Sequence, residues 1–422
     1  MPKAVKVMLI LGAVLVLFVG SFSGGFVSAT VLHQQNGFPL FGTKYPVPAE
    51  TDPNTVQSTD ETGIVEPSLE VLFEPFWRTW ELVHQMYVDQ PVNDTEMMRG
   101  AIKGMLESLG DEHTSYIDPE LLRQESIQLS GEYEGIGAWV DTTGEFLIIT
   151  NPMPDSPAEK AGIKPGDIVL KVDGEDMTGK DGNYALSKVL GPTGTVVTLT
   201  IQRTDQTSPM EFSITRAKIE VASVESKVLP GDIGFVHILT FGDKTGLELK
   251  QALRKLREQE IKGLVVDLRF NGGGLLTSAV DVGSQFLESG VLMYEEYGTG
   301  QAKEFRVKPG GLATDIPLVV LVNEGTASAS EIVAGAIQDM GRGKLVGVTT
   351  YGKGSVQNWI DLSEEEGAVR ITVARWLTPN KRQINKVGLT PDVEVTMTES
   401  DYLNEKDPQL DAAIKLLIEA IN

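Results

Sequence analysis

The first third of the chain alternates apolar and polar residues with the spacing of amphipathic helices. From Pro67 to about Ser126 the apolar side chains recur three and four positions apart, which gathers them on one helical face. They are Phe73, Phe76, Trp77, Trp80, Leu82, Val83, Met97, Ala101, Met105, Leu106 and Leu109. The pattern predicts an N-terminal helical unit over residues 66–130.

Short β-rich runs replace this pattern after Gly131, and Gly/Pro turns separate them. The runs are Phe146–Thr150, Ile168–Val172, Thr195–Gln202 and Met210–Thr215, with one helix near Gly182–Val189. Such content predicts a compact β-rich module over residues 131–217.

From Ile233 onward, apolar strands alternate with helical stretches. The strands are Gly263–Phe270, Pro317–Val322 and Lys344–Val348, and the helices are Thr245–Gln259, Leu275–Leu287 and Ser328–Met340. This alternation is typical of an α/β domain, which we expect over residues 218–400. A short amphipathic helix in residues 401–422 is expected to pack back on that domain. Because 422 residues are too many for one ordinary core, we expect a multidomain α+β protein.

The N-terminus indicates export. Lys3 and Lys6 precede an apolar run from Val7 to Val19, and residues 1–30 fit either a cleaved signal peptide or an uncleaved membrane anchor. In both cases the positive flank places the rest of the chain outside the cytoplasm, at the extracytoplasmic face of the membrane or in the periplasm or cell envelope. Residues 31–65, rich in Pro, Thr, Asp and Gly, are expected to form a flexible linker.

Composition removes several classes of function. A net charge of -23 without a basic stripe disfavours nucleic acid as a partner. The absence of cysteine excludes disulfides and thiolate chemistry. The four histidines (His33, His84, His113, His237) lack the spacing of metal ligands, so we expect no metal site and no cofactor.

Ser328 has two readings. With Glu331 it forms an S-x-x-E capping box at the start of a helix. A serine at a helix start also lies beside unpaired backbone N–H groups that can bind an oxyanion. Since no histidine is near in sequence, a nucleophilic serine here requires a lysine as its base.

Lys353, between Gly352 and Gly354, is the candidate base. A buried lysine can accept a proton as a neutral amine, whereas the alternative is a solvated turn residue. Gly347 through Lys353 also resembles a P-loop, but Gly354 replaces its Ser/Thr and the next residues read as a strand. A third segment, Asp267 to Gly274, runs from a strand into three glycines; it is either an oxyanion loop or a plain connection.

Together these segments resemble the carboxyl-terminal processing peptidases, also called tail-specific proteases. The resemblance runs from about Phe73 to the C-terminus and rests on stretches spread along that whole region. They are GAIKGMLESLGDEHTSY, YEGIGAWV, SPAEKAGIKPGDIVLKVDG, DLRFNGGGLL, NEGTASASEI, YGKGSVQ and DPQLDAAIKLL. The resemblance implies a PDZ-like module at residues 131–217 and an α/β catalytic core of the ClpP/crotonase type.

The resemblance also implies roles for individual residues. Ser328 matches the nucleophile, Lys353 its general base, Gln357 the residue that orients the lysine, and Glu331 a nearby carboxylate. The implied oxyanion donors are the backbone amides of Ala329 and of Gly273 or Gly274. The chemistry would be acyl transfer through a serine ester.

In the PDZ-like module, the residues in the place of the carboxylate-binding loop are Gly135, Ile136, Gly137 and Ala138. Family members often carry an arginine where this chain has Leu190, a departure that puts substrate sensing by that arginine in doubt. Lys188 is a candidate replacement or a solvent-facing helical lysine.

The sequence therefore predicts a serine endopeptidase that cleaves proteins near apolar C-terminal tails held by the PDZ domain. The alternative is an inactive PDZ scaffold. Besides substrates, expected partners include the membrane through the N-terminal segment; a homo-oligomer and an adaptor are left open.

Overall fold

The computed structural model describes residues 68–363 and 366–422. Of these, residues 120–356 and 373–422 form one unit, and residues 68–119 and 357–372 form another. The expected signal peptide or anchor and the expected linker lie outside the described residues. Within the described ranges, no helix combines the length and the apolar character needed to cross a membrane.

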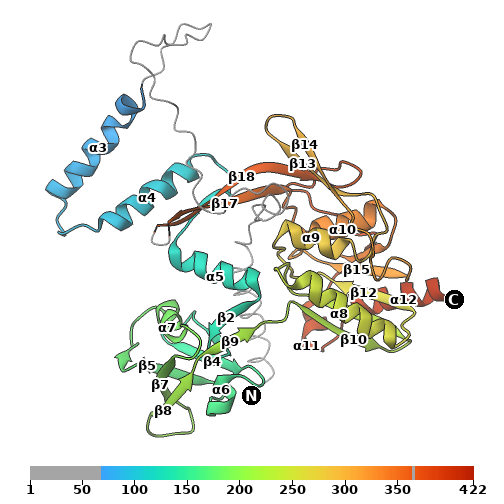
Figure 1. Cartoon of the computed structure of the whole chain (residues 1–422), viewed down its shortest axis with the longest axis horizontal. Helices are drawn as coiled ribbons and strands as arrows, with labels where there is room; N and C mark the ends of the chain where they lie inside the picture. The colour runs from blue at the N-terminus through green and yellow to red at the C-terminus, as the bar shows by residue number, and fades with distance from the viewer. Residues whose placement is uncertain (1–67, 364–365) are drawn as a thin grey trace. The chain divides into compact units, whose positions relative to one another are not determined.

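The smaller unit begins with two helices, α3 (Leu69–Met86) and α4 (Asp94–Glu107), drawn in blue in Figure 1. The side chains of Ser68 and Asn93 cap their first turns. Strand β1 (Ser115–Ile117) then pairs antiparallel with the first half of β18 (Gly367–Leu377). Helix α3 has no buried residue, and several of its apolar side chains are exposed.

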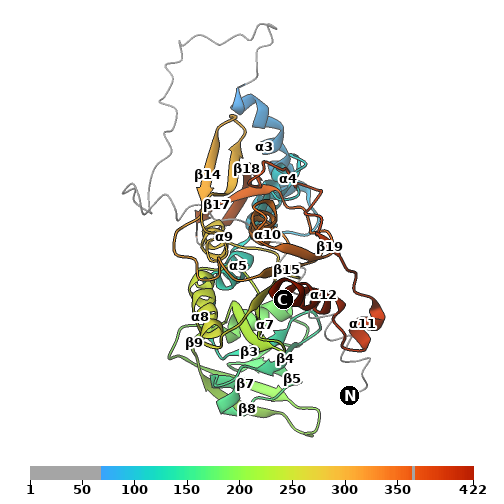
Figure 2. The same ribbon diagram turned by 90° about the vertical axis from the view of Figure 1, so that its right-hand side faces the viewer.

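After α5 (Pro119–Ser130), the chain enters the β-rich module through β2 (Glu132–Gly135) and leaves it through β9 (Ala217–Glu220), which pair antiparallel. Between them lies an antiparallel sheet whose strands run side by side in Figure 2. In spatial order it contains β3 (Ala138–Asp141), β4 (Leu147–Pro152), β5 (Asp167–Val172), β7 (Val196–Gln202) and β8 (Met210–Thr215), with β6 (Glu175–Asp176) beside β5. Two helices complete the module, α6 (Pro157–Ala161) and α7 (Gly182–Val189). Leu147, Ile149, Val169 and Leu199 are fully or almost fully buried in its core.

The α/β core is built on a sheet that is parallel except for its first strand. The strand order is β10 (Val224–Leu229), β11 (Ile233–Ile238), β12 (Gly263–Asp267), β15 (Leu318–Val322), β16 (Lys344–Gly347) and β19 (Val393–Glu394). Every residue of β12 and β15 is buried, as expected for parallel strands covered on both faces.

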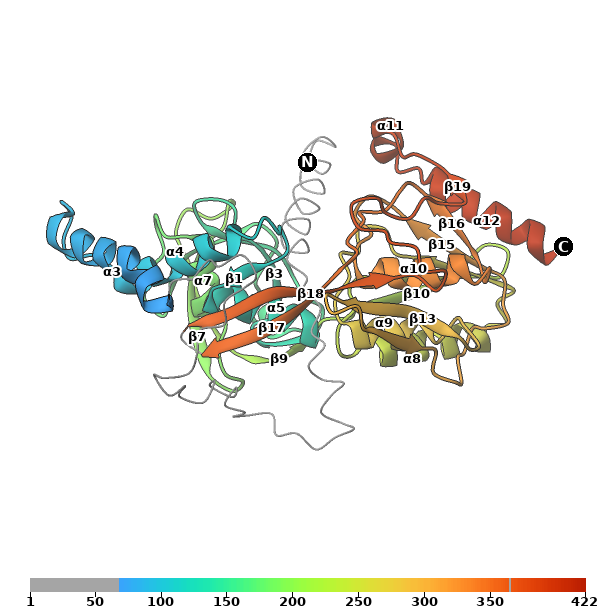
Figure 3. The same ribbon diagram turned by 90° about the horizontal axis from the view of Figure 1, so that it is seen from above.

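Helices cover the two faces of this sheet. Helices α8 (Thr245–Glu258), α9 (Leu276–Gly283) and α10 (Ala329–Asp339) share a core with Leu264 and Val266 of β12. On the opposite face, α12 (Pro408–Ile421) packs through Ala413 and Leu417 against Val265. Figure 3 shows α12 on one side of β15 and β16, and α8 and α9 on the other. The short α11 (Glu399–Leu403) precedes α12.

A second sheet contains β13 (Val291–Tyr297), β14 (Ala302–Arg306), β17 (Ser355–Ser363) and β18. β13 pairs antiparallel with β14 on one side and with the last four residues of β18 on the other. The division into two units falls inside β17 and β18.

The structure differs from the sequence prediction in element lengths. The strand predicted to reach Phe270 ends at Asp267, because Phe270 adopts a φ of 58° and turns the chain. The helix predicted to reach Leu287 ends at Gly283. The predicted alternation of strands and helices in the core is confirmed.

Candidate active site

Three loops leave the same edge of the parallel sheet. Strands β12, β15 and β16 are neighbours and run in one direction, so their carboxyl ends lie side by side. The segments that follow these ends are the glycine-rich segment after Asp267, the serine segment after Val322 and the lysine segment after Gly347. The topology therefore brings the three candidate motifs together.

Ser328 precedes α10 in a backbone conformation that residues with a side chain rarely adopt. Its φ is 56° and its ψ is -117°. Conformations of this kind cost about 1–3 kcal/mol and persist only where the surrounding structure imposes them. The side chain is fully buried, and within the described residues Ser328 Oγ has no hydrogen-bond partner, although the S-x-x-E spacing is present. Ser328 therefore stands at the N-cap of the predicted capping box with Glu331, but its hydroxyl makes no hydrogen bond there in the part of the chain that the structure describes.

Glu331 joins the serine segment to the lysine segment. Its Oε2 accepts hydrogen bonds from the backbone N–H groups of Ser328 and Lys353, both at 2.9 Å. Its Oε1 accepts from the Gly352 N–H at 2.7 Å and from the Thr350 hydroxyl at 2.5 Å. Burial raises the pKa of the Glu331 carboxyl, and the four hydrogen bonds oppose that rise. The backbone nitrogens of Ser328 and Lys353 thus meet at one oxygen.

Lys353 is held between two glycines that close packing requires. A β-carbon at Gly352, where φ is +86°, would lie 2.7 Å from the Gly388 nitrogen, and one at Gly354 would lie 2.7 Å from the Asn385 nitrogen. Lys353 is only 5% exposed, and its carbonyl accepts a hydrogen bond from the Trp376 indole N–H at 2.8 Å. The chain continues into β17 rather than into the helix of a P-loop, so this segment is not a P-loop.

The glycine-rich loop packs directly against Ser328. A β-carbon at Gly273, where φ is +101°, would lie 2.8 Å from both the Ala329 nitrogen and the Ser328 β-carbon. Gly274 has a similar restriction against Phe241, whose carbonyl oxygen would lie 2.4 Å from the added carbon. Only glycine therefore allows this loop to approach the start of α10.

Asn271 organises this loop, a role that the sequence alone did not suggest. Its Oδ1 accepts from the Gly273 N–H at 2.8 Å, and its carbonyl accepts from the Ala327 N–H at 3.0 Å and from Ser330 Oγ at 2.9 Å. Its Nδ2 donates to the Ile238 carbonyl at 2.7 Å. One asparagine thereby fixes the glycine-rich loop to the serine segment.

Gln357 falls in the smaller unit, on β17, where it is fully buried. Its Nε2 donates to Thr372 Oγ1 at 3.2 Å. The other candidate residues described above, Ser328, Ala329, Glu331, Gly273, Gly274 and Lys353, all belong to the larger unit.

The candidate carboxylate-binding loop joins β2 to β3. Gly137 has a φ of +76°, and a β-carbon there would lie 2.5 Å from the Ser156 β-carbon. The carbonyls of Ile136 and Gly137 accept hydrogen bonds from Ala158 and Met153. Within the described residues β3 pairs only with β4, so β3 is an edge strand with one side open to a further strand.

Leu190 and Lys188, which the sequence analysis singled out, each make a defined contact. Leu190 packs on the carboxylate-binding loop, since a β-carbon at Gly135 would lie 3.1 Å from Leu190 Cδ2. Lys188 forms an ion pair with Glu175 at 3.8 Å. Arg216, which sequence reasoning missed, donates to the carbonyls of Val189 and Lys188 at 2.8 Å. Its guanidinium therefore caps the C-terminal end of α7.

Comparison with known proteins gives three family matches. Residues 232–395 match peptidase family S41, residues 148–203 match the PDZ domain, and residues 42–121 match the N-terminal domain of the activating protease CtpB. The carboxy-terminal-processing protease of Bartonella bacilliformis is 39% identical over 325 residues, which are 76% of this chain and 74% of that protein. The chain belongs to the carboxy-terminal processing proteases of family S41.

A second curated relative agrees with this family. The carboxy-terminal processing protease CtpB of Bacillus subtilis is 34% identical over 372 residues, 87% of this chain and 76% of that protein. A solved structure titled photosystem II D1 C-terminal processing protease is 30% identical, covering 78% of this chain and 94% of that one, with a TM-score of 0.46.

This carboxy-terminal processing protease is a serine-type endopeptidase, and the predicted fold class is confirmed. The N-terminal helical region, the PDZ domain and the S41 core follow one another in the expected order. The curated relatives from Bartonella bacilliformis and Bacillus subtilis are both proteases, so the comparisons give no support to an inactive PDZ scaffold.

Proposed function

We propose that the protease cleaves its substrates with Ser328 as nucleophile and Lys353 as general base. The observation that carries the proposal is the Glu331 oxygen that binds both backbone N–H groups, because it fixes the two loops against each other. Both side chains are buried, which suits a base that must act as a neutral amine. Glu331 acts here as the joint between the two loops.

In the first step, Ser328 Oγ attacks the scissile carbonyl carbon and its proton passes to Lys353 Nζ. The tetrahedral intermediate collapses when Lys353 returns that proton to the leaving amine, so an ester on Ser328 and a free amine result. Water then attacks the ester, with Lys353 accepting the proton from water and returning it to Ser328 Oγ.

The developing oxyanion would be bound by backbone amides of Ala329 and the glycine-rich loop. The Gly273 N–H already donates to Asn271 Oδ1, so we assign the second donor to Gly274 in this conformation. On the basis of the family resemblance, we assign to Gln357 the role of orienting the Lys353 side chain.

The PDZ domain is proposed to receive the C-terminal tail of the substrate. A tail can add as a strand to the open edge of β3, while the loop of Gly135, Ile136, Gly137 and Ala138 binds the terminal carboxylate. The apolar side chain of Leu190 beside that loop favours an apolar last residue. We therefore propose unfolded proteins with apolar C-termini as the substrate class.

The domain limits given above and export of the protein remain part of this proposal. Export is supported by the charged and apolar pattern of residues 3–19. Appending a compartment-sensitive reporter to the protein's C-terminus, with and without residues 1–30, tests it. Equal reporter signals from both forms would contradict export.

The catalytic proposal is tested by incubating an unfolded substrate with the wild-type protein, Ser328→Ala and a control, Ser208→Ala, which alters an exposed loop serine. Cleavage is expected from the wild type and the control only. A parallel substrate with an amidated C-terminus should be cleaved more slowly if the PDZ loop binds the carboxylate. Equal cleavage by Ser328→Ala would eliminate the proposed nucleophile.

A further inference from the structure

We propose that the start of the C-terminal helix α12 positions the oxyanion loop through Arg269. In this view Asp407 and Gln409 are positioning residues for peptide hydrolysis, although they lie far from Ser328 in sequence. The inference rests on the proposed function, since it assigns these residues to the support of that same site.

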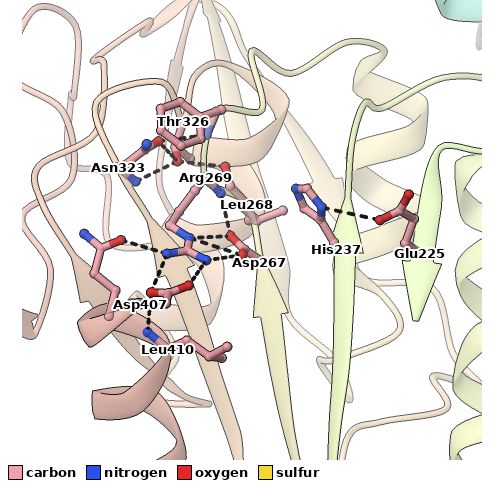
Figure 4. Close-up of polar contacts among 11 residues, drawn as sticks. Glu225, His237, Asp267, Leu268, Arg269, Asn323, Thr326, Asp407 and Leu410 are labelled. Carbon is pink, nitrogen blue, oxygen red and sulfur yellow. Dashed lines mark hydrogen bonds and ion pairs between the residues drawn. The ribbon is translucent and has the colours of Figure 1, made fainter. Parts of the chain in front are cut away.

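Arg269 is clamped between two carboxylates, as Figure 4 shows. Its Nε and Nη2 donate to Asp267 at 2.9 and 2.6 Å, and its Nη1 and Nη2 donate to Asp407 at 2.9 and 2.8 Å. Nη1 also donates to Gln409 Oε1 at 3.0 Å. The Arg269 and Asp267 side chains are 13% and 5% exposed and that of Asp407 is 31% exposed, so solvent screens the Arg269–Asp267 pair least. We call these four residues the Arg269 latch.

The latch lies immediately before the segment that forms the oxyanion loop. Phe270 follows it with a φ of 58°, and its N–H donates to Asn323 Oδ1 at 2.8 Å. Asn271 comes next and makes the bonds to Gly273 and Ala327 described above. A left-handed residue between two anchored neighbours keeps its conformation only while both anchors hold. A shift of Arg269 is therefore passed on to the glycine-rich loop.

The other half of the latch belongs to α12. Asp407 is the N-cap of that helix, and its Oδ1 accepts from the Leu410 N–H at 2.9 Å. Gln409 is 2% exposed, and its Nε2 donates to the Val395 carbonyl at 2.8 Å. The helix itself is fixed by Ala413 and Leu417 on the sheet face opposite α10. The Asp407 carboxylate thus both caps α12 and binds the Arg269 guanidinium.

This arrangement exceeds what helix capping alone requires. An N-cap needs one acceptor oxygen, and serine, threonine or asparagine would serve equally well. Two carboxylates on one guanidinium add geometric specificity, because a bidentate pair fixes the plane of the arginine as well as its distance. The latch therefore fixes the chain just after β12, and Asn271, which organises the glycine-rich loop, follows two residues after Arg269.

The test compares Asp407→Asn with Asp411→Asn. Asparagine keeps the N-cap but removes the charge that faces Arg269, whereas Asp411 lies exposed in the first turn of the same helix. We would measure kcat and KM on an unfolded substrate, and the rate at which a fluorophosphonate labels Ser328. All assays run below the temperature at which circular dichroism detects unfolding.

For Asp407→Asn we expect kcat and the labelling rate to fall on the order of tenfold or more, with KM within about twofold, because the loop is displaced but the tail site is intact. Asp411→Asn should match the wild type. A kcat equal to that of Asp411→Asn, or a lower melting temperature with unchanged kcat, would overturn the inference.

A double-mutant cycle makes the test independent of overall stability. Arg269→Lys keeps a positive charge beside the buried Asp267 but cannot form either of the two bidentate pairs. In that background Asp407→Asn should have a much smaller effect on kcat, and additive effects would count against the latch. If the wild type is not labelled at Ser328, the proposed function fails; if it is labelled but the cycle is additive, only the latch fails.

Discussion

Replacing Glu331 by glutamine is the sharpest test of how the serine and lysine segments of the proposed site are held together. The substitution preserves the shape of the side chain but changes one acceptor oxygen into an NH2 group. Four donors now converge on the carboxylate, two at each oxygen. The amide is expected to place its NH2 group where Oε1 stands, because the Thr350 hydroxyl can rotate to accept from it. The Gly352 N–H at that position cannot accept.

The expected cost follows from this single mismatch. A buried N–H group without a partner costs about 1–3 kcal/mol. Removal of a buried charge acts in the opposite direction, since burial disfavours the ionised form of Glu331. We expect the free energy of unfolding to fall by about 1–2 kcal/mol. The catalytic rate should fall on the order of a hundredfold, because displacement of the Gly352–Lys353 backbone misplaces the amine relative to Ser328.

Urea unfolding followed by circular dichroism measures the stability, and steady-state cleavage of an unfolded substrate measures kcat. The matched control is Glu324→Gln, which alters an exposed carboxylate in the same segment. The reasoning is refuted if Glu331→Gln unfolds and turns over like Glu324→Gln.

Three further outcomes are expected. Lys353→Ala should abolish turnover while circular dichroism shows a folded protein. The control is Lys344→Ala, which alters an exposed lysine. Retained activity in Lys353→Ala would remove this lysine from the mechanism. Gly137→Ala should weaken the binding of a tail peptide, measured by fluorescence titration, because φ is +76° and the new methyl would lie 2.5 Å from the Ser156 β-carbon. The control is Gly144→Ala, whose methyl meets nothing within 4 Å. Equal peptide affinities of the two variants would contradict this prediction. Burial acts to raise the pKa of Asp407, but the hydrogen bond and the charge of Arg269 hold this pKa below its usual value. The ionised Asp407 therefore stabilises the folded protein above about pH 4, and this stabilisation is lost as the pH falls through the folded-state pKa. Asp407→Asn should therefore show a flatter acid limb in unfolding experiments, and an unchanged limb would refute the assignment.

Local patterns in the sequence were sufficient for much of the core. Parallel strands buried on both faces produce continuous apolar runs, so Leu264 to Val266 and Leu318 to Val322 could be recognised without a structure. Strand β13 was not predicted, because its run Val291–Tyr297 carries charged residues and leads into a hairpin with β14 at the sheet edge. The strand end at Asp267 was misplaced because Phe270 takes up a left-handed conformation that no apolar pattern encodes.

The residues that hold the candidate site in place could not be predicted from the sequence for a different reason. Glu331 resembles an ordinary capping residue until Thr350 and Gly352 are seen at its second oxygen. Arg269 and Asp407 are separated by 138 residues, so neither suggests the other in sequence. Such roles depend on tertiary approach, whereas the identity of Ser328 and Lys353 was suggested by recognisable motifs.

The backbone angles of Ser328 are unfavourable for the residue type that occupies this position. Glycine is the residue that most easily adopts a φ of 56° with a ψ of -117°, yet glycine has no hydroxyl. A chain selected only for resistance to heat would drift toward glycine here and lose this hydroxyl. Under the proposed function, the strained backbone at Ser328 is retained because the hydroxyl is needed as the nucleophile.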